Sequence, residues 1–341
     1  MIDVKFRKID KGGYLASRVI VTGGSGFIGT NLIAHFVANG VEVINIDIVS
    51  PRNKSQVAYW RKVDLLDAKG LRDAIQSFNP DVIYHMGART DLDGRIQSDY
   101  AANTVGVENI IAAIEDLSAL QLVVFVSSRL VCRIGYQPSS DQDYCPTTHY
   151  GESKALGEQI VRSAASRIPC PWVIVRPTSI WGPWFDVPYK TFFLAIAKSR
   201  YFHPGKAKIL KSFGFVGNTV YQLVSLLKAD PVHFSGRTMY LADYPPIDVA
   251  QMADTIQRAE NARRVHSVPV ALLRVAACAG DAIKKLGYAH PPLTSFRLDN
   301  LLTPMVHDLQ LLESVVGKLP YTMHEGVDIT VTWLRQRGEI V

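Results

Sequence analysis

The stretch RVIVTGGSGFIGT, residues Arg18–Thr30, decides the fold. Its first five residues form a β-branched run typical of a buried strand, and glycines with the spacing GxxGxxG follow at once, at Gly23, Gly26 and Gly29. A helical pattern over Asn31–Ala38 comes next. Glycines at such a strand–helix junction allow a tight turn and close approach of the backbone to a pyrophosphate, and the helix N-terminus attracts its negative charge. The stretch therefore predicts a dinucleotide-binding unit.

The alternation of strand and helix continues downstream. Repeated β-α-β units with nearly continuous apolar strands imply a parallel sheet covered on both faces. We therefore predict an α/β fold, with a Rossmann-type doubly wound parallel sheet over residues 18–185 and a short lead over residues 1–17. The further strands that we expect are Val41–Ile48, Trp60–Leu65, Asp81–His85, Gln121–Ser127 and Trp172–Arg176.

Beyond residue 185 the alternation weakens, and helical patterns such as Val249–Ala262 and Pro269–Leu286 predominate. The sequence thus predicts a smaller, mostly helical substrate-binding region over residues 186–341. Some of its segments are expected to return to the sheet.

Composition describes a globular protein and excludes several classes. The chain has 341 residues, of which 48% are hydrophobic and 20% charged. No apolar run approaches the roughly 20 residues that a membrane helix needs, and the N-terminus lacks the apolar core of a secretory signal. Four cysteines form no CxxC pair, and the histidines show no metal-ligand spacing. We expect a reduced, cytoplasmic protein with no metal and no membrane partner.

The net charge of +6 is unevenly placed. Val187–Ala229 contains seven Lys and Arg residues and no Asp or Glu, so the rest of the chain sums to 6 − 7 = −1. Proteins that coat nucleic acid usually spread their cations along a face or tail, so a nucleic-acid partner is not expected. The stretch is either one local anion site or a solvated surface. Its position, where the chain leaves the cofactor-binding region, favours the anion site.

Asp47 ends the second expected strand. A carboxylate at this place can accept hydrogen bonds from both hydroxyls of an adenosine ribose, and it repels a 2′-phosphate. The sequence therefore predicts NAD in preference to NADP. Arg52 and Lys54 follow closely and leave NADP open as the alternative.

Tyr150 and Lys154 have the spacing YxxxK at the start of an expected helix. Residues four apart share one face of a helix, so the phenol and the ammonium can point to one place. A nearby ammonium lowers the pKa of a phenol, which would let Tyr150 exchange a proton with a substrate oxygen. Ser128 ends a parallel strand, where ligand sites gather in such sheets.

These motifs together resemble a known family. TGGSGFIG, Asp47, VDLLD (Val63–Asp67), YHMGA (Tyr84–Ala88), YGESK and VRPTSIWGP (Val175–Pro183) occur in the order found in extended short-chain dehydrogenases/reductases. The likeness is strong over residues 18–185, and more narrowly it is to NAD-dependent epimerases/dehydratases that act on nucleotide sugars. It is looser beyond, where Leu319–Leu334 resembles the closing helix of the group.

The resemblance implies a role for each matching residue. Ser128, Tyr150 and Lys154 would form the catalytic triad, and a homodimer would form through helices near Asn103–Leu117 and Ser153–Ala165. The residues that would contact NAD are Gly23, Gly26, Phe27, Ile28, Gly29, Asp47, Asp64, Leu65, Gly87, Ala88, Tyr150, Lys154 and Pro177.

Departures from the family pattern narrow the chemistry. In 4,6-dehydratases, acidic residues follow the hydroxyl residue and serve as acid and base, whereas Arg129 and Leu130 follow Ser128 here. Neither can transfer a proton at neutral pH, which argues against dehydration. Epimerisation of a nucleoside-diphosphate sugar through a transient keto sugar fits better. The candidate substrate contacts are Arg129, Ser179, Lys190, Lys211, Arg237 and Arg297.

Two other interpretations remain. An NAD(P)-dependent dehydrogenase or reductase of the hydroxysteroid or flavonol-reductase type would act on an apolar, uncharged substrate, and the apolar segment Pro269–Leu301 is compatible with it. A non-catalytic NAD-sensing scaffold is the third, and the intact Ser–Tyr–Lys set counts against it. An aromatic cluster after Ser179 could stack on a nucleobase or pack in a core.

Overall fold

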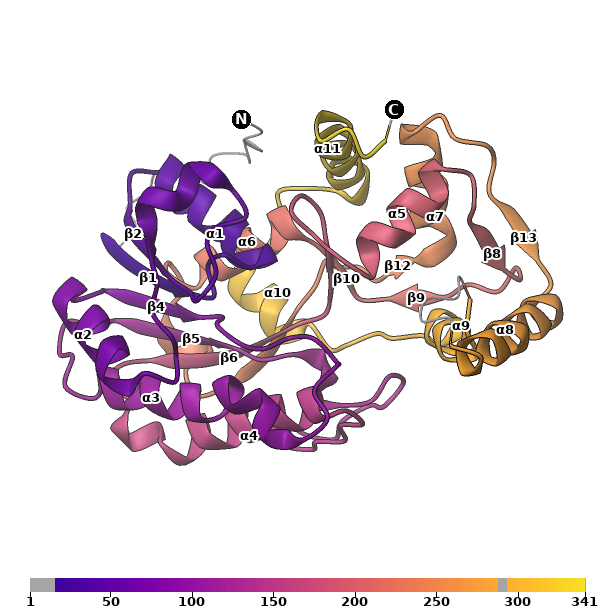
Figure 1. The fold of residues 1–341 in the computed structure, drawn as a ribbon. Helices are drawn as coiled ribbons and strands as arrows, with labels where there is room; N and C mark the ends of the chain where they lie inside the picture. Colours follow the sequence, from indigo (N-terminus) through magenta and orange to yellow (C-terminus); the bar gives the residue numbers. More distant parts are fainter. Residues whose placement is uncertain (1–15, 288–292, 341) are drawn as a thin grey trace.

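A computed structural model describes residues 16–287 and 293–340, and a seven-stranded parallel sheet organises it (Figure 1). The strand order is β11-β6-β5-β4-β1-β2-β3. The predicted α/β fold with a doubly wound parallel sheet is confirmed. All but two residues of the expected lead over residues 1–17 lie outside the described part. The strands are β1 Arg18–Thr22, β2 Glu42–Ile46, β3 Trp60–Arg61, β4 Val82–His85, β5 Leu122–Val126, β6 Trp172–Pro177 and β11 Thr238–Leu241.

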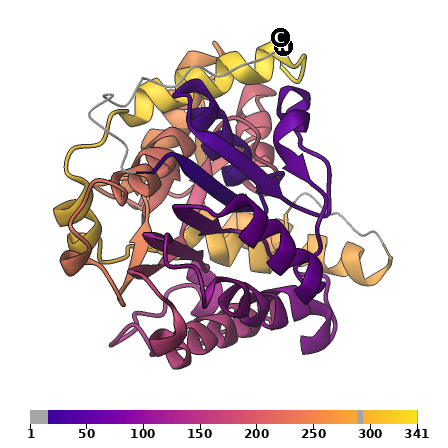
Figure 2. The ribbon, with the colours of Figure 1, turned by 90° about the vertical axis from the view of Figure 1, so that its left-hand side faces the viewer.

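Alternation along the strands gives the sheet two apolar faces, and helices cover both (Figures 1 and 2). In β1, Val19 and Val21 enter the core under α1, α6 and α10, while Ile20 enters the opposite core under α2, α3 and α4. All three side chains are fully buried. The helices are α1 Phe27–Ala38, α2 Ala68–Phe78, α3 Val105–Ile114, α4 His149–Ser163, α6 Val216–Ser225 and α10 Gln310–Val316.

The seventh strand comes from the C-terminal half of the chain. β11 pairs with β6 in parallel, with Thr238 opposite Ile174. Its four residues, TMYL, are too short and too mixed for the sequence to predict a strand. Because α6 and α10 also pack on the sheet, the chain passes between its two parts more than once.

A second core lies in the other lobe. Trp181, Phe193 and Phe215 are buried at its centre, with the Trp181 and Phe215 ring centroids 5.2 Å apart. Trp181, Phe185 and Phe193 of the aromatic cluster therefore pack in a core, whereas Trp184, Tyr189 and Phe192 are partly exposed. The elements of this lobe are α5 Tyr189–Ala197, α7 Val249–Ala259, α11 Met323–Gln336, β7 Ser179–Trp181, β8 Phe202–Pro204, β9 Leu210–Lys211, β10 Phe213–Phe215, β12 Ile247–Asp248 and β13 His266–Val268.

Two helices complete the lobe at the end farthest from the sheet (Figure 1). α8, Val270–Lys285, packs against α9, Ser295–Leu302. No helix in residues 16–287 and 293–340 is both long and apolar enough to cross a bilayer.

A buried ion pair ties helix α4 to strand β6. Arg176 donates to both carboxylate oxygens of Glu158, at 2.8 and 2.7 Å, and both side chains are almost wholly buried. Tyr144 donates a further bond to Glu158. Such a pair stabilises the fold only while both partners remain, because removing one leaves an uncompensated charge in the interior.

We therefore predict a large effect for Glu158→Ala. The free energy of unfolding should fall by about 3–5 kcal/mol, since the Arg176 guanidinium stays buried without its counter-charge. Urea unfolding followed by circular dichroism measures the change. The double variant Glu158→Leu/Arg176→Met should recover much of the loss. A cost below about 1 kcal/mol for Glu158→Ala would contradict this account of the pair.

Candidate functional site

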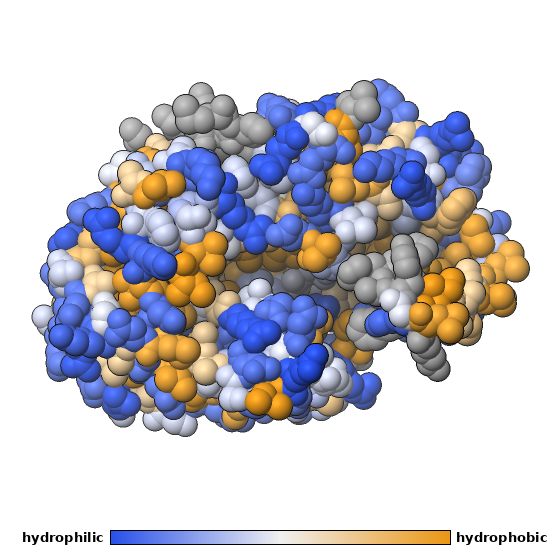
Figure 3. Space-filling view, in the orientation of Figure 1, coloured by the Kyte–Doolittle hydropathy of each residue, from blue (hydrophilic) through white to orange (hydrophobic). Residues whose placement is uncertain are grey.

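The predicted site residues gather at the carboxyl edge of the parallel sheet. The glycine loop follows β1, Asp47 follows β2, Gly87 follows β4 and Ser128 follows β5. In open α/β sheets this edge is where ligands bind, because loops from neighbouring strands meet there. Figure 3 shows the surface hollowed between the sheet and the C-terminal lobe.

The glycine loop fits a dinucleotide. A Cβ at Gly23 would lie 2.6 Å from the nitrogen of Gly87, and one at Gly29 would lie 2.7 Å from the carbonyl oxygen of Gly23, so neither position has room for a side chain. At Gly26 only the Gly23 oxygen, 3.1 Å away, comes near, so the outer side of the loop is open. No described side chain caps the N-terminus of α1, and its first turn holds no acid. Its N–H groups are therefore available to a pyrophosphate.

Asp47 is held beside this loop. Its carboxylate accepts hydrogen bonds from the backbone N–H groups of Ser25, at 3.1 Å, and Val49, at 3.0 Å. Burial raises the pKa of Asp47, and these N–H bonds act against that rise. Arg52, one of the two cations that left NADP open, forms an ion pair with Asp186 at 2.6 Å, whereas Lys54 is exposed.

Around Gly87 the ends of β1 and β4 are tied together. The Gly87 N–H donates to the hydroxyl of Thr22 at 3.0 Å, and the same hydroxyl contacts Nδ1 of His85 at 2.8 Å. Leu65 is buried, and its side chain would lie 2.8 Å from a Cβ at Gly87. Of the other predicted cofactor contacts, Asp64 is exposed, Ala88 follows Gly87 and Pro177 ends β6.

Helix α4 brings Tyr150 to Ser128. Thr148 caps the helix by accepting from the N–H of Gly151 at 3.0 Å, so Tyr150 lies in its first turn. The phenol lies within hydrogen-bonding reach of the Ser128 side chain. Burial raises the pKa of Tyr150, while the bond to Ser128 and the charge of Arg129 oppose the rise.

Lys154 is held at the end of β5. Its ammonium donates to the carbonyl of Val126 at 2.7 Å. Burial lowers the pKa of Lys154 to about 8, and the carboxylate of Glu158, one turn further along α4, opposes this. The charge of Arg129 opposes the rise that burial causes in the pKa of Tyr150.

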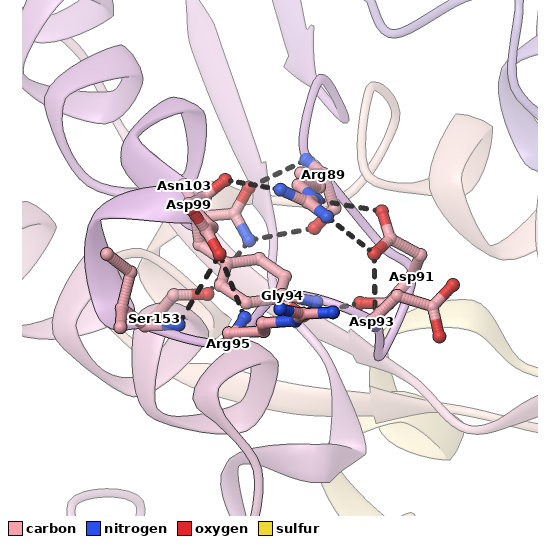
Figure 4. A network of polar contacts seen from close by, with 10 residues as sticks. Arg89, Asp91, Asp93, Gly94, Arg95, Asp99, Asn103 and Ser153 are labelled. Carbon is pink, nitrogen blue, oxygen red and sulfur yellow. Dashed lines mark hydrogen bonds and ion pairs between the residues drawn. The ribbon is translucent and has the colours of Figure 1, made fainter.

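A polar network joins the loop after β4 to helix α4 (Figure 4). The Asn103 side chain accepts from the N–H of Arg89 at 2.8 Å and donates to its carbonyl at 2.9 Å. It also donates to the Ser153 hydroxyl at 2.8 Å, and Ser153 donates to the carbonyl of Tyr150 at 2.7 Å. Asn103 therefore fixes the first turn of α4, and no local motif in the sequence marks it.

Arg129 lies among aromatic and basic side chains beside Tyr150. It hydrogen-bonds Tyr189, and its charge also acts on His307, whose pKa burial lowers to about 4. Tyr240 stacks on the His307 ring at a centroid distance of 4.1 Å. Sequence reasoning chose Arg129 but gave His307 and Tyr240 no place in the site, because they come from distant segments.

Lys211 is the second cation of this pocket. It is 7% exposed, and burial together with the charge of Arg129 lowers its pKa to about 8. Its ammonium donates to the carbonyl of Asn300 at 2.6 Å. Among the described residues no carboxylate pairs with Arg129 or Lys211. Ser179 lies close to Lys211, because it pairs with Phe213, two residues further along the chain. The buried hydroxyl of Ser179 has no hydrogen-bond partner in the described part of the chain.

The other predicted substrate contacts are not brought to this pocket. Lys190 forms an ion pair with Glu339 at 2.6 Å. Arg237 immediately precedes β11, at the amino end of the sheet, opposite the site. Arg297 is exposed on α9. The seven cations of the acid-free stretch Val187–Ala229 do not gather at one place. Lys211 is the one whose pKa the charge of Arg129 affects, because β9 carries it inward.

Three comparisons place the chain among known proteins. A family model described as NAD dependent epimerase/dehydratase family matches residues 19–210. The chain is 25% identical over 325 residues, 92% of it and 94% of the relative, to an Escherichia coli O157:H7 N-acetyl-alpha-D-glucosaminyl-diphospho-ditrans,octacis-undecaprenol 4-epimerase. It is 25% identical over 93% of itself, and 97% of the relative, to a Candida albicans sterol-4-alpha-carboxylate 3-dehydrogenase. Its fold superposes with a TM-score of 0.72, at 20% identity and 97% coverage of both chains, on the Bordetella bronchiseptica enzyme WbmG in complex with NAD.

Among the described residues no group of three His, Cys, Asp or Glu side chains could hold a metal ion.

His85 predicts a loss of stability in acid. Burial, reinforced by the charge of Lys154, lowers the pKa of its folded form to about 3, while the unfolded chain takes up a proton below about pH 6.5. The free energy of unfolding therefore falls as the pH drops from 6.5 towards 3, by about 1.4 kcal/mol per pH unit for this group.

Urea unfolding between neutral pH and about pH 4 measures that slope. We expect His85→Gln to reduce the slope by about one proton. An equal slope in wild type and His85→Gln would mean that the ring carries its proton in the folded protein.

Proposed function

The chain belongs to the NAD-dependent epimerase/dehydratase family, and we propose that it is an epimerase of nucleoside-diphosphate sugars. As a member it is an NAD-dependent enzyme of the extended short-chain dehydrogenase/reductase type. One observation carries the proposal. The charge of Arg129 acts on both Tyr150 and Lys211, and no ion pair among the described residues includes Arg129 or Lys211. Two partly desolvated cations at a reaction site suit a substrate with negative charge, which a sugar diphosphate carries.

The glycine loop, α1 and Asp47 would hold NAD with its reactive end toward Tyr150. The cofactor supplies, when bound, the acceptor and donor of hydrogen at the reacting carbon. Gly87, Ala88, Leu65 and Pro177 line the same edge of the sheet, and Asp64 would lie beside the adenine. The support for NAD over NADP is the Asp47 carboxylate next to the loop, together with the engagement of Arg52 by Asp186.

Tyr150 is the proposed acid and base. Its phenolate oxygen takes the proton of the substrate hydroxyl, and Ser128 donates a hydrogen bond to the substrate oxygen. Before this transfer the proton is on the substrate hydroxyl and Tyr150 is ionised. The positive charge of Arg129 favours this phenolate form. Lys154, held by the Val126 carbonyl, would contact the ribose next to the nicotinamide. Inversion requires the transient keto sugar to turn over in the pocket before Tyr150 returns the proton.

Lys211 and Arg129 would bind the diphosphate and orient the sugar, with Ser179 as a further contact. Lys190, Arg237 and Arg297 are not retained, since they are paired, distant or exposed. We also propose a homodimer through α3 and α4, supported by Val105 and Leu156, which are 41% and 40% exposed there. The division near residue 185 and a cytoplasmic location remain proposals of the same kind.

A dehydrogenase of sterol or steroid type is the second candidate, and the similarity to the Candida sterol dehydrogenase favours it. The sterol-4-alpha-carboxylate named for that relative carries one negative charge, whereas an uncharged steroid would leave Arg129 and Lys211 without an anion. The lipid-diphosphate sugar named for the Escherichia coli relative shares the diphosphate-linked sugar with our proposed substrates.

Turnover tests the proposal directly. The purified protein, with no NAD added, is incubated with UDP- and GDP-sugars, and chromatography follows the appearance of an epimer. We expect Tyr150→Phe to lower kcat by about 10²- to 10⁴-fold with the amount of bound NAD unchanged. Turnover left intact in Tyr150→Phe would refute the assigned role. A melting temperature raised by a steroid, and by no nucleotide sugar, would favour the second candidate.

Arg129→Met tests whether Arg129 binds the substrate directly or only adds to the net positive charge of the chain. Losing a charge-assisted bond to the diphosphate should raise KM for a nucleotide sugar about 10- to 100-fold. Arg237→Met removes the same charge at the opposite end of the sheet and should leave KM unchanged. If both variants raised KM equally, Arg129 would contribute only long-range attraction.

A further inference from the structure

Helix α8 leaves most of its apolar side chains in solvent. Leu272 is 62% exposed, Val275 71% and Ile283 46%, and Leu286, which ends the helix, is 87% exposed. Single exposed apolar residues are normal on a protein surface, but a contiguous row on one helix is not. Figure 3 shows hydrophobic residues gathered at the end of the molecule where Figure 1 places α8.

The helical period sorts these side chains onto one face. At about 100° per residue, Leu272, Val275 and Ile283 fall within a single arc, and the exposed Ala276 and Ala279 fill it. The opposite side, with Ala277 and Gly280 buried, faces α9. The arc through Leu272, Val275 and Ile283 is thus apolar along the helix.

The segments around α8 carry exposed positive charge. On α8 itself, Arg274 is exposed and forms an ion pair with Asp299 of α9 at 3.2 Å, and Lys284 is exposed on the side that also carries Ala277 and Gly280. Asp281, the acid of α8, points to α9, where its carboxylate accepts from the N–H of Ser295. Neighbouring segments add exposed cations: Gly205 packs against Val270 at the start of α8, and the exposed residues of these segments are Lys198, Arg200, Lys206, Lys208, Arg263 and Arg264.

We propose that α8 docks on the surface of an anionic lipid bilayer. An apolar helical face in a lobe rich in exposed Lys and Arg suits the boundary between acyl chains and headgroups, because the apolar side chains leave water while the cations contact lipid phosphates. The helix lies on the bilayer and does not cross it. This also gives a role to the exposed cations of the acid-free stretch that do not reach the substrate pocket.

A second copy of the chain suits this face less well. The area is too small, because a helix of 16 residues is roughly 24 Å long and 10 Å wide, and stable dimers bury about 800 Å² per partner.

Flotation with vesicles tests the proposal without reference to turnover. The full chain is mixed with vesicles of phosphatidylcholine containing about one third phosphatidylglycerol, or with phosphatidylcholine alone. We expect flotation with the anionic vesicles, weakened by ~0.5 M salt, which screens the cations. Val275→Glu should lower the partition coefficient about tenfold, since a charge replaces a buried apolar group. Val232→Glu is the matched control at a site 75% exposed on the far lobe, and it should float as wild type does.

Two results would overturn the proposal. One is the absence of flotation with the anionic vesicles at low salt, or an equal loss in Val232→Glu and Val275→Glu. The other is a dimer, measured by light scattering, that Val275→Glu splits while Val232→Glu does not, because α8 would then be an interface between copies. Circular dichroism and the content of bound NAD establish that each variant is folded.

Discussion

The close contact between Gly23 and Gly87 is the constraint on which the site depends. With no Cβ on either residue, the loops that follow β1 and β4 touch, and a side chain at Gly23 would fall 2.6 Å from the Gly87 nitrogen. Thr22 then bonds both Gly87 and His85 across the two strand ends. Because these strands are neighbours at the centre of the sheet, the contact fixes where the glycine loop lies relative to the residues after β5.

Helix α4 is anchored from both sides of that edge. Asn103 and Ser153 hold its first turn, and Arg176 holds Glu158 two turns further on. The position of Tyr150 is therefore set by hydrogen bonds of the helix that carries it, and its phenol takes no part in them. The Lys154 ammonium on this helix lies between the carbonyl of Val126 and the carboxylate of Glu158. These two partners favour its charged form, although burial disfavours it.

Sequence reasoning succeeded where the signal is local. The glycine spacing predicted the loop and the YxxxK spacing predicted that Tyr150 and Lys154 share a helix face, because each depends on a few consecutive residues. It failed where tertiary contacts decide. β11 is a strand because β6 offers it an edge, and the seven cations of the acid-free stretch separate because β9 turns Lys211 inward. The charge of Arg129 acts on Tyr150 through a tertiary contact that no local spacing marks.

The central claim is that the glycine loop and Asp47 form a site for NAD. Calorimetric titration of the cofactor-free protein with NAD and with NADP tests it most directly. The account predicts that NAD binds at least about tenfold more tightly, because the carboxylate bonds a free ribose and repels a 2′-phosphate, and that Asp47→Asn narrows the difference. Equal affinity for the two nucleotides in the wild-type protein, or tighter binding of NADP, would contradict it.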